Sequence, residues 1–376
     1  RLIRRQRQMC IRDRDIARHV KARFYLNEGT HYKYHDELEY ASEAEKWLQM
    51  AATESDKLIT SGRYEIYNTG HPQEDYFNMY RIDDKSDLKE AVLYVDYKTN
   101  IREHNMAAAG REAGCGFSKS FVESFLCSDG LPISLSNKYL GDETMRKETA
   151  NRDPRLKQLI LTNDFPTNVT DDLKDSTFVV NEDEFITQHC FTGYRPIKGF
   201  NPIYSQALYM KSSFDGIAYR YAETLLINAE AKAELNTITN ADLDRTVNQL
   251  RDRVGMPHLT VNVGFTDPKW PDWGYSLSPV LQEIRRERCI ELAGEGFRFN
   301  DLKRWKAGKL LNNVLTYVGK RKPDGNLAIV YPNYTNPDLS YQAGKSRTWE
   351  DKMYLYPIPT GELQRNPQLL PQNPGW

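Results

Sequence analysis

The sequence has few cysteines, and none of them forms a metal-binding or redox motif. Five cysteines occur among 376 residues, an odd number at wide spacings and without a C-x-x-C pair. A zinc or redox site made of cysteines is therefore not expected. No apolar run approaches the 18 residues that a membrane-spanning helix needs, which excludes a helical membrane span. A chain of this length can bury a large core without a metal or disulfide to stabilise it.

The sequence also lacks an excess of either charge. Lys and Arg together number 51 and Asp and Glu 52, which leaves a formal net charge of −1. A dedicated nucleic-acid-binding protein needs a basic field to displace counterions from phosphate, so this class is excluded. The nucleophile elbow G-x-S-x-G, the P-loop and the dinucleotide motif G-x-G-x-x-G are all absent. No motif therefore indicates an enzyme or a bound cofactor.

Two histidines have the spacing of a helical metal pair. His31 and His35 lie four residues apart in HYKYH, which would place both on one face of a helix. Tyr32 stands where the H-E-x-x-H motif has its glutamate, and the other histidines are isolated. No metal site is predicted.

Aromatic residues are abundant for so polar a chain. The sequence has 23 Tyr, 14 Phe and 6 Trp, with a mean hydropathy of −0.70. Many rings must therefore lie near the surface, where they suit sugars or protein interfaces.

The best candidate for a ligand site is a loop over 256–278 that contains three rings, Trp270, Trp273 and Tyr275. Prolines and a glycine break this loop, so we expect at least one indole to be accessible to solvent. Sugar C–H faces stack on such rings, and Asp267, Lys269 and Asp272 beside them could bind hydroxyls. The alternative is a loop pinned by its rings against the scaffold or a partner. A loop with Tyr331 and Tyr334 is the next candidate.

Apolar residues recur at helical spacing in two separated helix pairs, over 16–62 and 216–256. Alanines on their contact faces allow close approach, as in tetratricopeptide repeats. Between the pairs, residues 63–215 carry turn signals and predict loops and short strands. The predicted fold is mainly α, a tetratricopeptide-like helical-repeat scaffold with a loop-rich, short-strand insertion face. Its expected elements are helices from Ile16, over 36–60, near 118–126, over 218–235 and over 243–254, and a strand over 90–96.

A charged helix over 279–292 leads into the densest cluster of charges. Glu287, Glu291 and Glu295 fall on one face if the helix extends that far, and Asp301 follows. One interpretation is a carboxylate pair for glycoside hydrolysis. The other is a structural ion-pair network, in which arginines keep the carboxylates ionised. The second is favoured, because four arginines stand near the acids in sequence: Arg285, Arg288, Arg298 and Arg304.

The amino-terminal segment is unusual. Residues 1–14 read RLIRRQRQMCIRDR, with six arginines and no initiating Met. The segment has no apolar core of a signal peptide, and Cys10 lacks the small and apolar residues that precede a lipidated cysteine. Residues 1–15 are either a processing or assembly scar or native structure, and both readings stay open. The pattern from Ile16 suggests that an upstream part of a helical domain is absent.

Three stretches together resemble the SusD/RagB family of outer-membrane nutrient-binding lipoproteins. The central one is similar to the family signature ER-x-x-EL-x-x-EG-x-R-x-x-DL-x-RW and places Glu287, Glu291, Glu295, Arg298, Asp301, Arg304 and Trp305 in it. Cys289 and Gly294 depart from the common pattern. The stretches are AYRYAETLLINAEAKAELN with VNQLRDRVGMP from Ala218 and Val247, LQEIRRERCIELAGEGFRFNDLKRWKAGK from Leu281, and YLYPIPTGELQRNPQLLPQNPGW from Tyr354. Weaker matches are SGRYEIY from Ser61, DGLPI from Asp129 and RDPRL from Arg152.

The resemblance implies one SusD-like domain over 16–376. Its parts are the two helix pairs over 16–62 and 216–256, the loop-rich region 63–215, and the signature helices with an extended carboxyl-terminal tail over 257–376. It also implies a structural role for the signature residues, no catalysis, no cofactor and no metal.

In function, the resemblance implies a glycan-binding protein at the cell surface, anchored to the outer membrane by a lipid on an upstream cysteine. Such a protein captures oligosaccharide, or sometimes peptide, for a SusC-like TonB-dependent transporter. A helical-repeat adaptor that binds another protein and a glycoside hydrolase are the alternatives.

Overall fold

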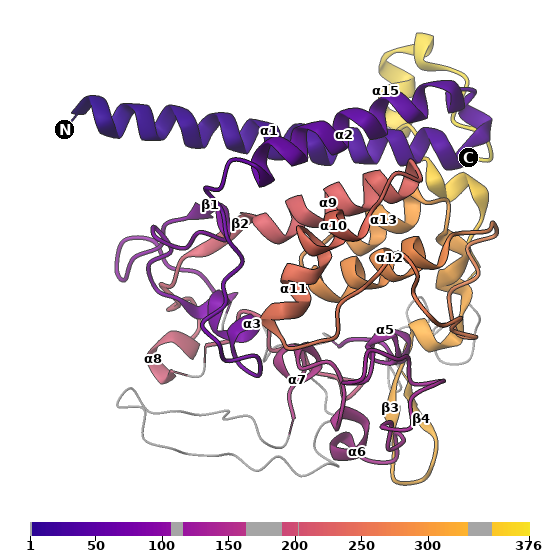
Figure 1. Cartoon of the computed structure of the whole chain (residues 1–376). Helices are drawn as coiled ribbons and strands as arrows, with labels where there is room; N and C mark the ends of the chain where they lie inside the picture. The colour runs from indigo at the N-terminus through magenta and orange to yellow at the C-terminus, as the bar shows by residue number, and fades with distance from the viewer. Residues whose placement is uncertain (1, 107–115, 163–189, 202, 330–347) are drawn as a thin grey trace.

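The computed structural model describes residues 2–106, 116–162, 190–201, 203–329 and 348–376. Its largest feature is a layer of two antiparallel helices, α1 (Leu2–Tyr34) and α2 (Ala44–Ile59). The helix α9 (Tyr221–Glu234) packs beneath them, and shorter helices and loops follow below (Figure 1). The structure is mainly helical with few short strands, as predicted.

Both helices of the first pair begin at other residues than predicted. α1 starts at Leu2, well before Ile16. The helix expected from residue 36 starts only at Ala44, after two short 3₁₀ turns, η1 (Asp36–Leu38) and η2 (Ala41–Glu43). Glu39 between the turns has a positive φ of 60°. That left-handed conformation cannot continue a right-handed helix, so the amphipathic pattern over 36–43 does not form one.

The second pair also differs in its ends. Residues 216–220 form the strand β2 (Gly216–Arg220), so α9 begins at Tyr221 instead of at 218. The single helix expected over 243–254 is two short ones, α10 (Asn240–Asp244) and α11 (Val247–Arg253). The predicted apolar face is nonetheless correct, because Leu243, Val247 and Leu250 are buried in one cluster with the leucines of α9.

The signature segment forms two helices, α12 (Pro279–Glu291) and α13 (Arg298–Arg304). Pro279 begins α12, a position where its missing N–H is not needed. The helix ends at Glu291, close to the expected end, so the condition under which Glu295 would share its face is not met. Gly294 and Gly296 have φ of +73° and +84° and turn the chain. This conformation also accounts for Gly294 at a position where the family pattern has a large side chain.

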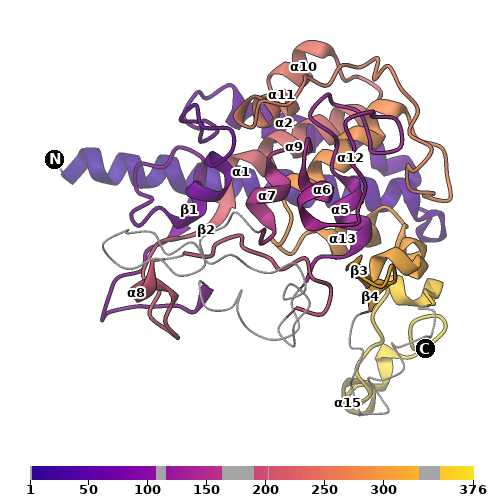
Figure 2. The same cartoon turned by 90° about the horizontal axis from the view of Figure 1, so that it is seen from below.

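The described part of the region over 63–215 is rich in loops, as predicted, and most of it lies below the helical layers (Figures 1 and 2). The expected strand is β1 (Ala91–Val95), which pairs antiparallel with β2. The expected helix near 118–126 is α5 (Lys119–Ser124), capped by the Ser118 side chain. Other short helices here are α3 (Asp75–Asn78), η3 (Met79–Arg81), α6 (Met145–Thr149), α7 (Arg155–Leu159) and α8 (Tyr204–Ala207).

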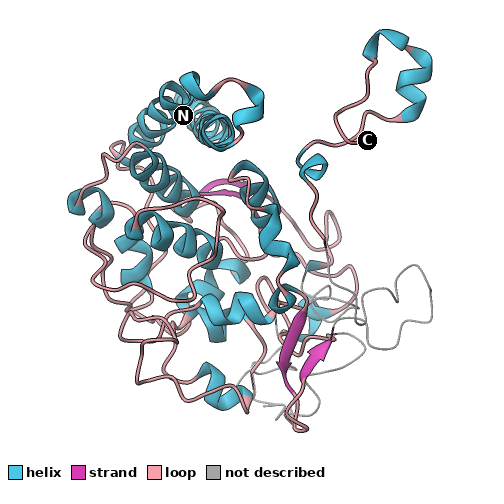
Figure 3. Cartoon of the chain, turned by 90° about the vertical axis from the view of Figure 1, so that its right-hand side faces the viewer, coloured by secondary structure: helices cyan, strands magenta, loops and turns pink. Residues whose placement is uncertain are grey.

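After α13, the chain leaves the helical layers. Two turns, η5 (Gly308–Asn312) and η6 (Val314–Thr316), lead to a hairpin of β3 (Val318–Arg321) and β4 (Leu327–Ile329). The last described residues contain η7 (Asp351–Tyr354), α15 (Thr360–Arg365) and η8 (Pro367–Leu369). The start of this tail is pinned by a ring, as expected: Tyr354 is buried against His35 and accepts a hydrogen bond from the Gly308 N–H. The part that carries α15 and η8 stands away from the body (Figure 3), and its side chains are mostly exposed. That part is not simply extended, because it contains two short helices, and Trp376 donates only within the tail, to Lys352 and Leu355.

No helix among the described residues has both the length and the apolar character to cross a bilayer. α1 is long, but charged residues occur throughout it.

Close approach of α1 and α2 depends on a residue without a side chain. Gly29 is buried where α1 faces α2, and a Cβ there would lie 2.9 Å from the backbone nitrogen of Leu48 and 2.8 Å from its Cγ. Any larger residue at position 29 would push the two helices apart.

We therefore expect Gly29→Ala to lower the free energy of unfolding by on the order of 1 kcal/mol, since overpacking outweighs the gain in helix propensity. Gly361→Ala is the matched control. Gly361 also lies in a helix, and a Cβ added there would meet nothing within 4 Å. Chemical denaturation of both variants should show the loss only in the first. Equal stability of the two would contradict a tight contact at Gly29.

Candidate functional site

The acids of the signature helix lie in a buried network of arginines. Glu291 accepts hydrogen bonds from Arg253 Nη2 at 2.6 Å, Arg220 Nη1 at 2.7 Å and Arg155 Nη1 at 3.0 Å. Glu287 binds the same Arg155 and Arg251 Nε at 3.2 Å. We call this set of five residues and Arg251 the Glu291 network. Its cations come from α7, β2 and α11, and none of them is among the four arginines that we expected.

Glu295 joins the network from the turn after α12. Lys198 Nζ and Arg220 Nη2 donate to it at 2.6 and 2.7 Å. Arg220 also pairs with the buried Glu90 at 2.8 Å. The side chains of this cluster are therefore linked through Arg220, although Glu295 is outside the helix.

Three further signature residues, Asp301, Arg304 and Trp305, belong to a second cluster between α13 and α9. Asp301 accepts from Arg288 Nε at 2.9 Å and Arg304 Nε at 3.0 Å. Glu230 of α9 accepts from Arg304 Nη2 at 2.8 Å and from the Trp305 indole at 2.7 Å. Two of the expected arginines thus bind Asp301. The other two differ: Arg285 pairs with Glu234 at 2.9 Å, and Arg298 is exposed at the start of α13.

These contacts keep the acids ionised. Burial alone would raise the pKa of Glu291, but the guanidinium groups of Arg253, Arg220 and Arg155 hold it well below its usual range. The pKa of Glu295 and that of Asp301 are likewise lowered, against the effect of burial, by their basic neighbours. A general acid for glycoside hydrolysis needs a raised pKa, so this geometry favours ion pairs over acid–base chemistry.

A hydroxyl, a histidine and a carboxylate are linked by hydrogen bonds between α1 and α9, in the order found in catalytic triads. No sequence motif indicated this arrangement. His19 lies 2.9 Å from Thr224 Oγ1 and 2.8 Å from Glu223 Oε2. All three side chains are buried between the helices. A substrate cannot reach this hydroxyl, so the arrangement stabilises helix packing instead of providing a nucleophile.

The pair His31 and His35 does not form a metal centre. The rings stack at 4.1 Å between centroids, and His35 bonds to Glu37 and to the Lys303 carbonyl. Burial lowers the pKa of His31 to about 4. The described parts of the chain contain no group of three or more side chains that could hold a metal ion.

The three rings of the 256–278 loop are held by α12 and α13. The Trp270 indole is half-buried and donates to Glu283 Oε1 at 2.7 Å. Trp273 is 6% exposed, donates to Gln282 and packs edge-to-face on Trp305 at 5.5 Å. Tyr275 stacks on Tyr34 at 4.4 Å and donates to the Trp305 carbonyl. One indole is thus partly accessible, as expected, and the loop is also pinned to the scaffold.

Trp270 and Trp273 line a cleft of about 750 Å³, which we call the ring-loop cleft. The polar neighbours of the rings differ in availability. Asp267 is buried and already accepts from Ser134 and Arg286, whereas Lys269 and Asp272 are exposed on the rim. The rest of the lining includes Ile133, from the weakly matching stretch DGLPI, and residues of segments that no motif indicated: Ser120, Phe121, Leu310, Leu311 and Asn313. The candidate loop with Tyr331 and Tyr334 lies outside the described residues.

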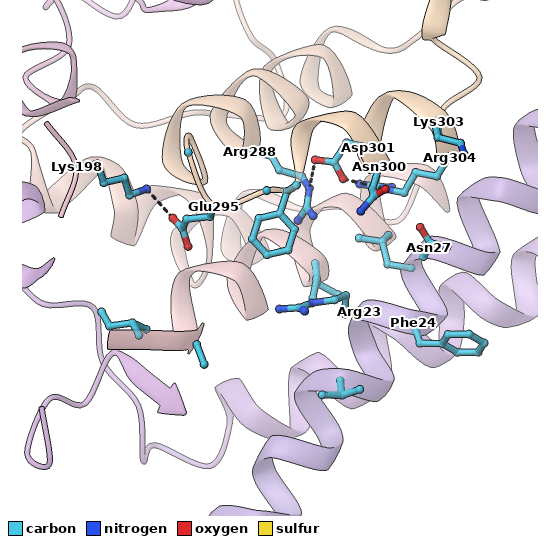
Figure 4. A pocket seen from close by; sticks show the side chains of 18 of the residues that line it. Arg23, Phe24, Asn27, Lys198, Arg288, Glu295, Asn300, Asp301, Lys303 and Arg304 are labelled. Atoms are coloured by element: carbon cyan, nitrogen blue, oxygen red, sulfur yellow. Dashed lines mark hydrogen bonds and ion pairs between the residues drawn. The ribbon is translucent and has the colours of Figure 1, made fainter. Parts of the chain in front are cut away.

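A second cavity, of about 1140 Å³, lies between α1 and the turn that joins α12 to α13. We call it the α1 cavity. Figure 4 shows Arg23 of α1 opposite Arg288 and Asp301, with Lys198 and Glu295 at one end and Lys303 at the other. No sequence pattern indicated this cavity, because its walls combine residues that are far apart in the chain.

Comparison with known proteins gives a consistent result. The model of the SusD family matches residues 46–376. SusD-like protein P2 of Formosa agariphila is 33% identical over 166 residues, which cover 44% of this chain and 27% of that protein. A SusD-like protein from Bacteroides fragilis has a TM-score of 0.64 at 24% identity, covering 96% of this chain and 65% of that one. A SusD-like carbohydrate-binding protein from the same organism has a TM-score of 0.58 at 23% identity, with 86% and 61% covered. The chain thus spans less than two thirds of the length of these relatives.

The Glu291 network predicts a large effect of a small change. Glu291→Gln should lower the free energy of unfolding by about 3–5 kcal/mol, because three arginines lose a buried partner. The control is Glu65→Gln, which removes a carboxylate from an exposed pair with Lys89 and should cost less than about 1 kcal/mol. Denaturant titration measures both. If Glu291→Gln lowered the free energy of unfolding no more than the control does, the network would not contribute to stability as a buried carboxylate with three cations should.

The lowered pKa values predict the pH dependence of stability. The pKa of Glu223 lies at about 2, since hydrogen bonds from His19 and Arg23 outweigh its burial, and that of Glu291 is also lowered. A depressed folded-state pKa contributes stability above the unfolded value near 4.5 and loses it as the pH falls. We expect the melting temperature to fall between about pH 4.5 and 2, and to fall less steeply in Glu291→Gln than in the wild type. Parallel curves for the two proteins would contradict this.

Proposed function

The chain belongs to the SusD family, and from this membership we propose that it captures saccharide at the cell surface without chemical turnover. The captured saccharide would pass to a SusC-like TonB-dependent transporter in the outer membrane. A lipid on a cysteine amino-terminal to the family match would hold it there. A relative of the same fold described as carbohydrate-binding is in keeping with this proposal.

The observation that carries the proposal is the ring-loop cleft. It combines an indole face, apolar side chains and hydroxyl groups from several segments in one hollow of about 750 Å³. Sugars present apolar C–H faces and hydroxyl edges, so they need rings and small polar groups side by side. Trp270 would provide the main stacking surface, since part of its ring stays exposed in the cleft. Trp273 would contribute less, since it is largely buried and packs on Trp305, and Tyr275 does not line the cleft.

Binding without catalysis agrees with the pairing of the signature carboxylates with basic side chains. Glu287, Glu291, Glu295 and Asp301 all bind arginine or lysine side chains. A glycosidase would need one of them protonated near neutral pH and close to a free carboxylate. The hydrolase alternative therefore has no acid–base pair in the signature segment. The adaptor alternative predicts no affinity for sugars and is tested by the same titration.

Calorimetric titration with a panel of neutral oligosaccharides tests the proposal. We expect modest affinity that is nearly insensitive to salt, because the contacts are uncharged. Trp270→Ala should weaken binding by about 1–3 kcal/mol, by analogy with ring stacking on nucleic-acid bases. Trp273→Phe should have a smaller effect. Release of reducing ends should be absent in every sample.

The control for these variants is Trp376→Ala. Trp376 is 48% exposed in the carboxyl-terminal tail and is not among the residues that line the cleft. Its loss should leave both affinity and melting temperature unchanged. Affinity within twofold of wild type in Trp270→Ala and Trp273→Phe, with folding intact, would place the binding site elsewhere. Binding of no oligosaccharide by the wild type would count against the function itself.

A further inference from the structure

The walls of the α1 cavity carry more basic than acidic groups. Five described lysines and arginines and three described acids line it. Both oxygens of Asp301 already accept from Arg288 and Arg304. Both oxygens of Glu295 likewise accept hydrogen bonds. The third acid, Asp215, is held by backbone N–H groups. No lining carboxylate is therefore left to neutralise the remaining donors.

Several of the basic groups have unused donors. Arg288 donates its Nε–H to Asp301 and lies 3.8 Å from Glu230, and its buried Nη1 has no hydrogen-bond acceptor among the described residues. Lys303 forms no ion pair with any carboxylate that the structure describes, and its Nζ lies 4.0 Å from the centroid of the Tyr356 ring. Arg23 pairs with Glu223, which does not line the cavity, and keeps a third of its side chain exposed. A buried guanidinium without a full set of acceptors is unfavourable, so an anionic acceptor in the cavity would stabilise the Arg288 side chain.

An aromatic ring lies close to both arginines. The guanidinium carbon of Arg23 lies 5.1 Å from the Phe297 centroid, and that of Arg288 lies 5.4 Å from it. Asn27 of α1 and the exposed Asn300 of α13 add amide groups to the rim. The cavity therefore presents an apolar ring beside two cations, with neutral hydrogen-bonding groups around them. These are the features that a ring-shaped ligand with one negative group and several hydroxyls requires.

We propose that the α1 cavity binds the anionic group of an acidic saccharide, a carboxylate or a sulfate ester, between Arg23 and Arg288. The sugar ring lies on Phe297, and Lys303 approaches the anionic group from the rim. The inference rests on the proposed function in one respect, that the cargo is a saccharide. It adds the chemical class of that cargo and a site separate from the ring-loop cleft.

Three matched probes test this: tetragalacturonate for the carboxylate, sulfated maltotetraose for the sulfate ester, and maltotetraose as the neutral analogue. At low salt, the wild type should bind at least one charged probe about tenfold more tightly than maltotetraose, as charge-assisted hydrogen bonds are stronger than neutral ones. The preference should shrink at 1 M salt, where charges are screened within about 3 Å. The charged probe that binds more tightly indicates whether the anionic group of the natural ligand is a carboxylate or a sulfate ester.

Two variants locate the preference. Arg23→Gln and Lys303→Gln should each reduce it about fivefold or more, since each removes one cation from the cavity. Lys303→Gln keeps the test valid if Arg23→Gln unfolds, because Lys303 is only half-buried and carries no structural ion pair. Lys21→Gln is the matched control, as Lys21 is an exposed cation of α1 outside the cavity. It should leave the preference unchanged.

The outcomes separate this inference from the proposed function. Charged probes that bind no better than maltotetraose, or a preference that survives in both cavity variants, would overturn the inference while neutral binding at the ring-loop cleft could stand. Loss of the preference for charged probes in the cavity variants would support the inference. If Trp270→Ala also left the binding of neutral probes unchanged, the ring-loop cleft would be rejected as the site of neutral binding. Absence of binding for all three probes would overturn the inference, and the neutral panel would then decide the function.

Discussion

Burying a carboxylate is unfavourable unless cations and hydrogen-bond donors surround it, and Glu291 meets this condition with three arginines. Those arginines come from α7, β2 and α11, so the ion pairs fix these elements against the end of α12. Arg220 extends the contact to Glu90 beside β1 and to Glu295 after the helix. The position of α12 is therefore set by charge as well as by its apolar face.

α12 in turn forms part of three environments. Arg285, Arg286 and Cys289 line the ring-loop cleft, Arg288 lines the α1 cavity, and Glu287 and Glu291 lie in the network between them. The two hollows thus share one rigid wall. They differ in character, because the cleft combines rings with apolar side chains whereas the cavity has a surplus of cations. If both proposed sites bind saccharide, α12 contributes side chains to each of them.

Sequence reasoning predicted the local elements better than their contacts. The period of apolar residues identified α9 and the strand β1, and the aromatic loop identified part of the ring-loop cleft. It failed where a single backbone conformation intervened, as at Glu39 and at Gly294. The partners of Glu287 and Glu291 were also missed, because nearby arginines in sequence were favoured over distant ones. Arg155, Arg220 and Arg253 lie in stretches that carry the family resemblance, yet nothing in one sequence shows that these stretches converge in space. The α1 cavity was missed for the same reason.

The order of the network's residues along the chain bears on how the protein acquires its structure. The partners of Glu291 precede it by 136, 71 and 38 residues. A nascent chain that has emerged only as far as α11 already contains Asp153 and Glu90, which pair with Arg155 and Arg220. It still lacks Glu287 and Glu291, so part of the charge of these arginines is not neutralised, and their mutual repulsion opposes close packing of the central elements. The network is complete only once the signature segment has been made, and we therefore expect the body of the protein to reach its final packing late in synthesis.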